Sequence, residues 1–130
     1  MNAVQKVKFL VLMAAARLRG DEVPAMDGLS GNDIDTMYDE LVEKGFHWDA
    51  IGEVRGGEVE TGLATEYDRN YEAKAVATQL PVGSWIGWTY WYGGGKHGNP
   101  DEVPWMDDVY ELDCQEEEKV VIVRNFNLRK

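Results

Sequence analysis

Lys96 and His97 are the side chains best suited to bind an anion, because they are the only base and the only histidine in a long acidic stretch. They lie in a glycine-rich segment, Gly93–Pro100, whose backbone N–H groups could form an anion-binding nest. The segment lacks the P-loop pattern G-x-x-x-x-G-K-[ST], and its glycine spacing does not fit the dinucleotide fingerprint. A flexible connection between two strands is the alternative interpretation of the same residues.

The single cysteine, Cys114, could act as a nucleophile if His47 or His97 served as its base. Its position favours another role, because Cys114 alternates with Tyr110 and Leu112 in a strand-like run. Such a pattern indicates a small buried hydrophobe. A lone cysteine also forms no intramolecular disulfide, which fits a reducing compartment.

Carboxylates near His97 suggest a metal or acid–base site, but their spacing matches no known motif. Neither the EF-hand pattern nor H-E-x-x-H occurs in the sequence. Nothing singles out two of the 24 acids as a catalytic pair. We therefore expect a protein that is not an enzyme and that carries no metal and no cofactor.

An aromatic run, Trp85–Tyr92, is the most distinctive segment of the chain. Strand alternation places Trp85 and Trp91 on one face and Trp88 on the other, with Gly87 leaving a notch between the first two. A sheet with one wet face has a polar side, whereas this strand is aromatic on both. Either both faces are covered within the chain, or one face meets a partner, since tryptophan is enriched in binding hot spots.

The charge of the chain narrows the class of partner. The sequence has 24 Asp and Glu against 13 Lys and Arg, a net charge of −11. Residues 1–19 carry four positive charges and residues 120–130 carry three, whereas residues 20–119 carry a net charge of −18. An acidic surface repels phosphates, which argues against direct binding of nucleic acid or an anionic membrane. A protein partner with a basic surface fits it.

Helix-forming residues fill positions 3–19, and Gly20 follows them as a C-cap. The apolar run within this segment resembles a signal-peptide core, but it stops at Arg17 and is too short to span a bilayer. We interpret it as a buried first helix of a cytoplasmic protein. Apolar residues at helical spacing predict a second helix over 32–45.

The period changes from helical to two after Gly45, which predicts strands. Gly56-Gly57 suggests a short hairpin over 54–59. Longer strands are expected at 70–79, 83–92, 108–115 and 119–126, with the last two forming a hairpin. The order predicts one α+β domain over residues 1–130, with two N-terminal helices packed on a curved antiparallel sheet of four main strands. A cone-like fold of the nuclear-transport-factor-2 or cystatin kind satisfies the same order.

The stretch from Glu53 to about Phe126 resembles small uncharacterised proteins carried by tailed bacteriophages and prophages. The resemblance is carried by Glu53–Glu60, Tyr71–Lys74 and Trp85–Pro100. It implies an accessory protein that acts in the host cytoplasm. Small acidic phage proteins often block host systems such as CRISPR complexes, restriction enzymes or RNA polymerase, by presenting carboxylates where a basic groove expects phosphates. The basic ends of this chain depart from a full mimic of nucleic acid.

We therefore expect a non-enzymatic protein, a monomer or a homodimer, that docks on and inhibits a basic host partner. Two alternatives stay open: a small-molecule module with a pocket lined by Trp85, Trp88, Trp91 and Tyr110, with the loop Gly93–Gly98 as its lid, and a virion assembly protein joined through its aromatic strand. The residues predicted to contact the partner are Asp35, Asp39, Glu43, Trp85, Trp88, Trp91, Lys96, His97, Asp101, Glu102, Trp105, Asp107 and Asp108.

Overall fold

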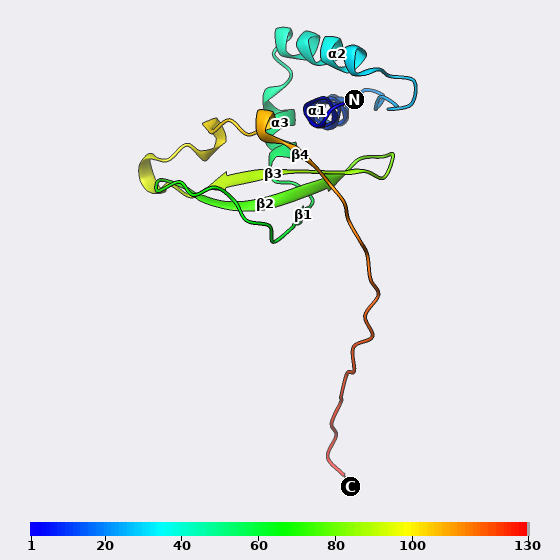
Figure 1. Cartoon of the computed structure of the whole chain (residues 1–130), viewed down its shortest axis with the longest axis vertical. Coiled ribbons are helices and arrows are strands. Elements are labelled where there is room, and N and C mark those ends of the chain that lie inside the picture. The colour runs from blue at the N-terminus through cyan, green and yellow to red at the C-terminus, as the bar shows by residue number, and fades with distance from the viewer. Residues whose placement is uncertain (130) are drawn as a thin grey trace.

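The computed structural model describes residues 1–129 and has the predicted α+β class. Three helices precede an antiparallel sheet of four strands in the order β1-β2-β3-β4 (Figure 1). The sheet is open and does not close into a cone. The helices are α1 (Ala3–Arg19), α2 (Gly31–Glu43) and α3 (Trp48–Arg55). The strands are β1 (Val59–Glu60), β2 (Glu72–Gln79), β3 (Trp85–Tyr92) and β4 (Tyr110–Leu112). Three 3-10 turns lie between β3 and β4: η1 (Gly95–His97), η2 (Pro100–Glu102) and η3 (Met106–Asp108).

Helix α1 is the middle layer of the molecule, with α2 on one side and the sheet on the other (Figure 1). This position explains why its apolar residues are not confined to one stripe: Val7, Phe9 and Val11 are all fully buried. The helix begins at a capping box formed by Asn2 and Gln5 and ends at Gly20, as the sequence predicts.

Helix α2 packs on α1 rather than on the sheet, so of the two N-terminal helices that were predicted to pack on the sheet only α1 does so. It begins at a second capping box, in which Ser30 and Asp33 exchange side-chain and backbone hydrogen bonds. Ile34 and Leu41 are its buried residues. Met37 and Tyr38 are partly buried against the core, and Asp39, Glu40 and Glu43 are exposed.

Helix α3 replaces the period-two strand and the hairpin over 54–59 that the sequence suggested, so that prediction is wrong. Ala50, Ile51 and Val54 lie at helical spacing and pack with the core beside α1. This burial outweighs the local strand pattern, because helices in proteins are stabilised mainly by packing of an apolar face. Trp48, which alternation placed in a strand, is 74% exposed at the start of the helix.

Strands β2 and β3 form the centre of the sheet and confirm the strands expected at 70–79 and 83–92. Their antiparallel register runs from Glu72 opposite Tyr92 to Gln79 opposite Trp85. One face of this pair lies against the helices and buries Ile86 completely. No helix covers the other face (Figure 1).

The C-terminal hairpin is the largest difference from the predicted fold. Strand β4 has only three residues where 108–115 was expected, and residues 113–129 contain no helix or strand. The predicted strand at 119–126 is therefore absent, and Cys114, expected to be buried, is exposed. Both differences have the same physical reason. Strand β4 lies at the edge of the sheet, and among residues 1–129 no further strand pairs with it to bury Cys114 and the residues that follow.

No helix among residues 1–129 has the length and apolar character that crossing a bilayer requires.

Candidate functional site

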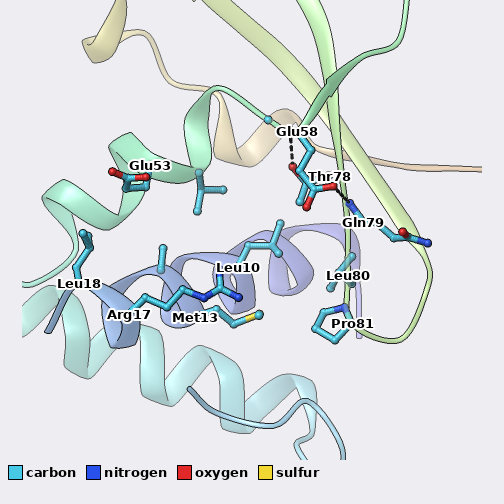
Figure 2. A pocket seen from close by; sticks show the side chains of 13 residues that line it. Leu10, Met13, Arg17, Leu18, Glu53, Glu58, Thr78, Gln79, Leu80 and Pro81 are labelled. Atoms are coloured by element: carbon cyan, nitrogen blue, oxygen red, sulfur yellow. Dashed lines mark hydrogen bonds between the residues drawn. The ribbon is translucent and has the colours of Figure 1, made fainter. Parts of the chain in front are cut away.

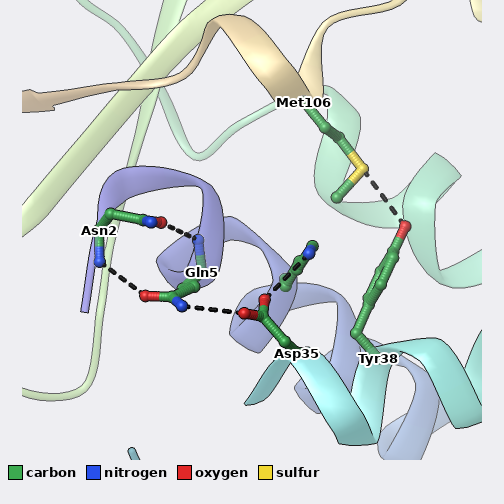
Figure 3. Close-up of polar contacts among 6 residues, drawn as sticks. Asn2, Gln5, Asp35, Tyr38 and Met106 are labelled. Carbon is green, nitrogen blue, oxygen red and sulfur yellow. Dashed lines mark hydrogen bonds and ion pairs between the residues drawn. The ribbon is translucent and has the colours of Figure 1, made fainter. Parts of the chain in front are cut away.

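Two acidic segments that lie far apart in the sequence, helix α2 and turn η3, contact each other through Tyr38. Tyr38 projects from α2, and its hydroxyl donates a hydrogen bond of 3.7 Å to the thioether sulfur of Met106 in η3 (Figure 3). Burial is the main cause that raises the pKa of Tyr38, and the carboxylates of Asp39 and Asp107 raise it further.

We call the acidic surface the exposed carboxylates of α2 and η3: Asp39, Glu43, Asp107 and Asp108. All four were predicted from the sequence to contact a partner. The contact between Tyr38 and Met106 brings their two elements together, and the side chains of all four carboxylates are open to solvent. Their helix and turn are both held against α1, so the surface has a rigid base.

Asp35, predicted to contact a partner, is occupied within the chain. Its two carboxylate oxygens accept hydrogen bonds of 3.0 Å from the side chains of Gln5 and Lys8 (Figure 3). The hydrogen bond from Gln5 and the bond from Lys8 hold the pKa of Asp35 below its usual value. Asp35 therefore joins α1 to α2, and both of its oxygens are already bonded within the chain.

Few carboxylates are neutralised by the chain itself. Within residues 1–129, five of the 24 acids form ion pairs, which leaves nineteen without a cationic partner. The four members of the acidic surface belong to these nineteen. A patch of this kind creates a negative potential that attracts a cationic surface. The paired acids are Asp21, Asp35, Glu60, Asp101 and Glu111.

Asp101 is tied to the sheet by Arg55, a residue that sequence reasoning did not single out. The Arg55 side chain is only 11% exposed, and its Nη1 lies 3.4 Å from Oδ1 of Asp101. The guanidinium also lies over the ring of Tyr90 and donates a hydrogen bond to the carbonyl of Trp91. Arg55 therefore fixes turn η2, while the neighbouring Glu102 stays exposed.

Two of the predicted contact tryptophans lie in the core, so their assignment to a contact surface is wrong. Trp88 is fully buried, and its indole N–H donates a hydrogen bond of 2.8 Å to the carbonyl of Arg55. Trp105 is also buried, and its ring centroid lies 5.0 Å from that of Trp88. Neither ring can touch a partner, because both belong to the core that α1 and α3 enclose.

Trp85 and Trp91 lie on the face of the sheet that no helix covers, and both are half-buried. The notch expected at Gly87 is filled, because a Cβ there would lie 2.7 Å from Leu112 and 2.9 Å from Tyr110. A pocket lined by Trp85, Trp88, Trp91 and Tyr110 together is excluded, since Trp88 points to the opposite face.

Lys96 and His97 are exposed on the one-turn helix η1, as a candidate anion site would require. The glycines around them have another explanation: a Cβ on Gly94 would meet the ring of Tyr71 at 2.7 Å and the backbone of Gly98 at 3.0 Å. Close packing of the loop therefore accounts for these glycines without a bound anion.

A groove of about 440 Å³ lies between α1, α3 and the β2–β3 turn. Its floor is apolar, with Leu10, Met13 and Leu80 along it (Figure 2). Its rim is polar: the Arg17 side chain extends along the groove. At the end of β2, the backbone N–H of Glu58 donates to the hydroxyl of Thr78, and the carboxylate of Glu58 accepts from the backbone N–H of Gln79. No pattern in the sequence predicts this groove, because three separate segments build it.

Tyr38 and Arg55 are the residues whose roles sequence reasoning missed. In the sequence, Tyr38 belongs to the apolar stripe of its helix, and this pattern indicates no role for its hydroxyl. Arg55 was placed in a hairpin turn. The helical spacing of Ala50, Ile51 and Val54 was the signal that would have placed Arg55 on a helix facing the sheet.

Among residues 1–129, no three His, Cys, Asp or Glu side chains are grouped so that they could hold a metal ion. Comparisons of the chain with protein-family models, with curated proteins and with solved structures find no match.

Proposed function

We propose that this chain is a non-enzymatic binding protein that docks on a basic surface of a partner protein. The contact is made by the acidic surface of Asp39, Glu43, Asp107 and Asp108. The observation that carries the proposal is that the hydrogen bond from Tyr38 to Met106 joins α2 to η3, across 68 positions of sequence, and that the four exposed carboxylates of these two elements form no ion pair within residues 1–129.

The partner proposed here is a protein that handles nucleic acid, such as a CRISPR complex or another defence complex of a bacterial host. Such a partner has a basic groove that normally holds phosphates, and carboxylates on a rigid base can occupy it. Occupation of the groove would exclude the nucleic acid and so inhibit the partner. The resemblance to phage accessory proteins supports this choice of partner.

Capture from bacterial lysate at different salt concentrations tests the docking mode. The immobilised protein is expected to retain a basic partner at about 0.1 M salt and to release it at about 1 M, where charges are screened within about 3 Å. Added duplex DNA is expected to compete with the protein for the retained partner. Retention that is unchanged at high salt would contradict an electrostatic contact.

Two variants with equal charge changes separate the acidic surface from overall acidity. The first carries Asp39→Asn, Glu43→Gln, Asp107→Asn and Asp108→Asn, and is expected to lose the partner. The matched control neutralises four exposed acids elsewhere, through Glu22→Gln, Glu66→Gln, Glu116→Gln and Glu117→Gln. Equal capture by both variants would show that net charge alone, rather than this surface, recruits the partner.

A second candidate function is favoured by the groove between α1, α3 and the β2–β3 turn. Its volume of about 440 Å³ suits a small ligand with an apolar body, and Arg17 at its rim suits an anionic group. Anilinonaphthalene sulfonate has both features and is expected to fluoresce on binding. The signal should fall in Met13→Glu and persist in the matched control Leu112→Glu, which is half-buried on the opposite side of the sheet.

A further inference from the structure

The C-terminal segment, residues 113–129, leaves β4 and runs away from the body of the protein (Figure 1). Its last part, residues 120–128, is unusually apolar for an exposed segment: Val120 is 98% exposed, Phe126 is 88% exposed, and Val121, Ile122, Val123 and Leu128 are at least 73% exposed. Proteins rarely leave such a contiguous apolar stretch uncovered in water, so it indicates a contact with another surface.

The sequence of this segment is that of a β-strand. Val120–Val123 is a run of β-branched residues, which favours extended backbone and burial on both faces. Beyond it, Arg124, Phe126 and Leu128 share the face of Ile122, whereas Asn125 and Asn127 lie on the other face. The pattern is typical of a strand whose first half is buried on both faces and whose second half has one face in water.

An acceptor for such a strand exists at the edge of the sheet. Among residues 1–129, strand β4 pairs only with β3, so the backbone groups on its other side have no strand partner there. A groove of about 350 Å³ lies beside it on the uncovered face, with Leu63, Trp85 and Leu112 among its lining residues. An open edge next to an apolar groove is the usual setting for addition of a strand.

Charge identifies the donor of that strand as another copy of this chain. Residues 120–130 carry three positive charges and no negative ones, whereas residues 20–119 carry a net charge of −18. The basic segment of one molecule is therefore complementary to the acidic body of a second. We propose that residues 119–128 of one copy pair with β4 of a second copy, and that the exchange is reciprocal and gives a two-fold symmetric dimer.

The acidic residues between β4 and this segment favour exchange over a hairpin within one molecule. Asp113, Glu116, Glu117 and Glu118 lie in this connection and repel one another and the acidic body. Repulsion of this kind extends a linker and opposes the tight turn that a hairpin needs. The pairing that sequence alone predicts between 108–115 and 119–126 is thus made between two molecules. The proposal does not depend on the function of the acidic surface.

Size-exclusion chromatography with light scattering on the full chain tests the proposal. We expect a mass twice the 14.7 kDa of one chain, falling to that of one chain on dilution. Ile122→Asn with Phe126→Asn, which leaves the charge unchanged, is expected to weaken the dimer about tenfold or more. The control, Asn125→Gln with Asn127→Gln, changes only the face predicted to be in water and should retain the dimer.

Because all four positions lie in an exposed segment, circular dichroism and melting of the diluted single chain should be the same for both variants. Mixed copies labelled with donor or acceptor dyes on the one thiol of the chain, that of Cys114, should show energy transfer in the wild type and lose it in the Ile122/Phe126 variant. A single-chain mass at all concentrations would overturn the proposal, as would larger open assemblies or equal weakening by the two variants.

Discussion

The two faces of the β-sheet differ in a way that their amino-acid content does not show. Both faces of β3 carry tryptophan, yet the face toward the helices buries Trp88 completely, whereas Trp85 and Trp91 on the other face stay half-buried. The difference arises from α1, which supplies an apolar cover on one side only. An aromatic strand therefore indicates a surface that is favourable to bury. Whether it is buried within the same molecule depends on the other elements of the chain.

Truncation of one tryptophan on each face gives the largest expected contrast. Trp88→Ala leaves a cavity beneath α1 and removes the hydrogen bond to the carbonyl of Arg55, so it should lower the free energy of unfolding by about 3–5 kcal/mol. Trp85→Ala removes a half-exposed ring and should cost about 1 kcal/mol. Chemical denaturation at a concentration that keeps the chain monomeric measures both. Equal losses would show that the uncovered face is as well packed as the covered one.

A methyl group added to the uncovered face should have an intermediate effect. A Cβ on Gly87 would meet Leu112 at 2.7 Å, Tyr110 at 2.9 Å and the carbonyl of Val76 at 3.1 Å. Gly87→Ala is therefore expected to destabilise the fold by about 1–2 kcal/mol. Gly52→Ala is the matched control, because it has open space on α3 and should stabilise by about 0.5–1 kcal/mol. If Gly87→Ala leaves the free energy of unfolding unchanged, Leu112 and Tyr110 must be able to move aside at little cost.

Acid should weaken the helical side of the molecule, where Asp33, Asp35 and Glu111 all have lowered pKa values in the folded state. A carboxyl with a lowered folded pKa stabilises the fold above its unfolded pKa, and this stabilisation is lost as the pH falls through the folded value. We expect the Tm to hold between pH 7 and about pH 5 and to fall below it. Differential scanning calorimetry across this range measures the slope.

Asp35→Asn should flatten that acid slope, because it removes the carboxyl that accepts from Gln5 and Lys8. Asp39→Asn removes the same charge without breaking an ion pair and serves as the control. Identical slopes in the two variants would place the acid sensitivity elsewhere than in the contact between α1 and α2.

The helices with strong local signals and the two central strands could be predicted from sequence, because capping residues, apolar spacing and alternation agree there. Helix α3 could not, since Gly56 and Gly57 suggested a hairpin while the packing of Ala50 and Val54 against α1 decided the outcome. The strand at 119–126 was predicted from propensity alone. Propensity describes the chain locally and does not say whether a paired strand is present beside it.

The sequence predicted that the candidate site would contain exposed acids, but only some of the residues it named are free to contact a partner. Exposed acids on α2 and η3 were expected, and four of them remain available. The loss of Asp35, Trp88 and Trp105 from the predicted set has one cause: a side chain with contact chemistry can be satisfied inside the fold. Sequence shows which groups a residue offers, whereas only the packing shows which of them are already occupied.

The position of α1 between two layers has a consequence for synthesis on the ribosome. Its helical partners α2 and α3 end at residues 43 and 55, but its cover on the side of the sheet, β3, is complete only at residue 92. At about 5–20 residues per second, one apolar side of α1 stays uncovered for several seconds after α2 has formed. During this interval the nascent chain presents a helix that chaperones can bind, and slower translation between residues 43 and 92 would lengthen that exposure.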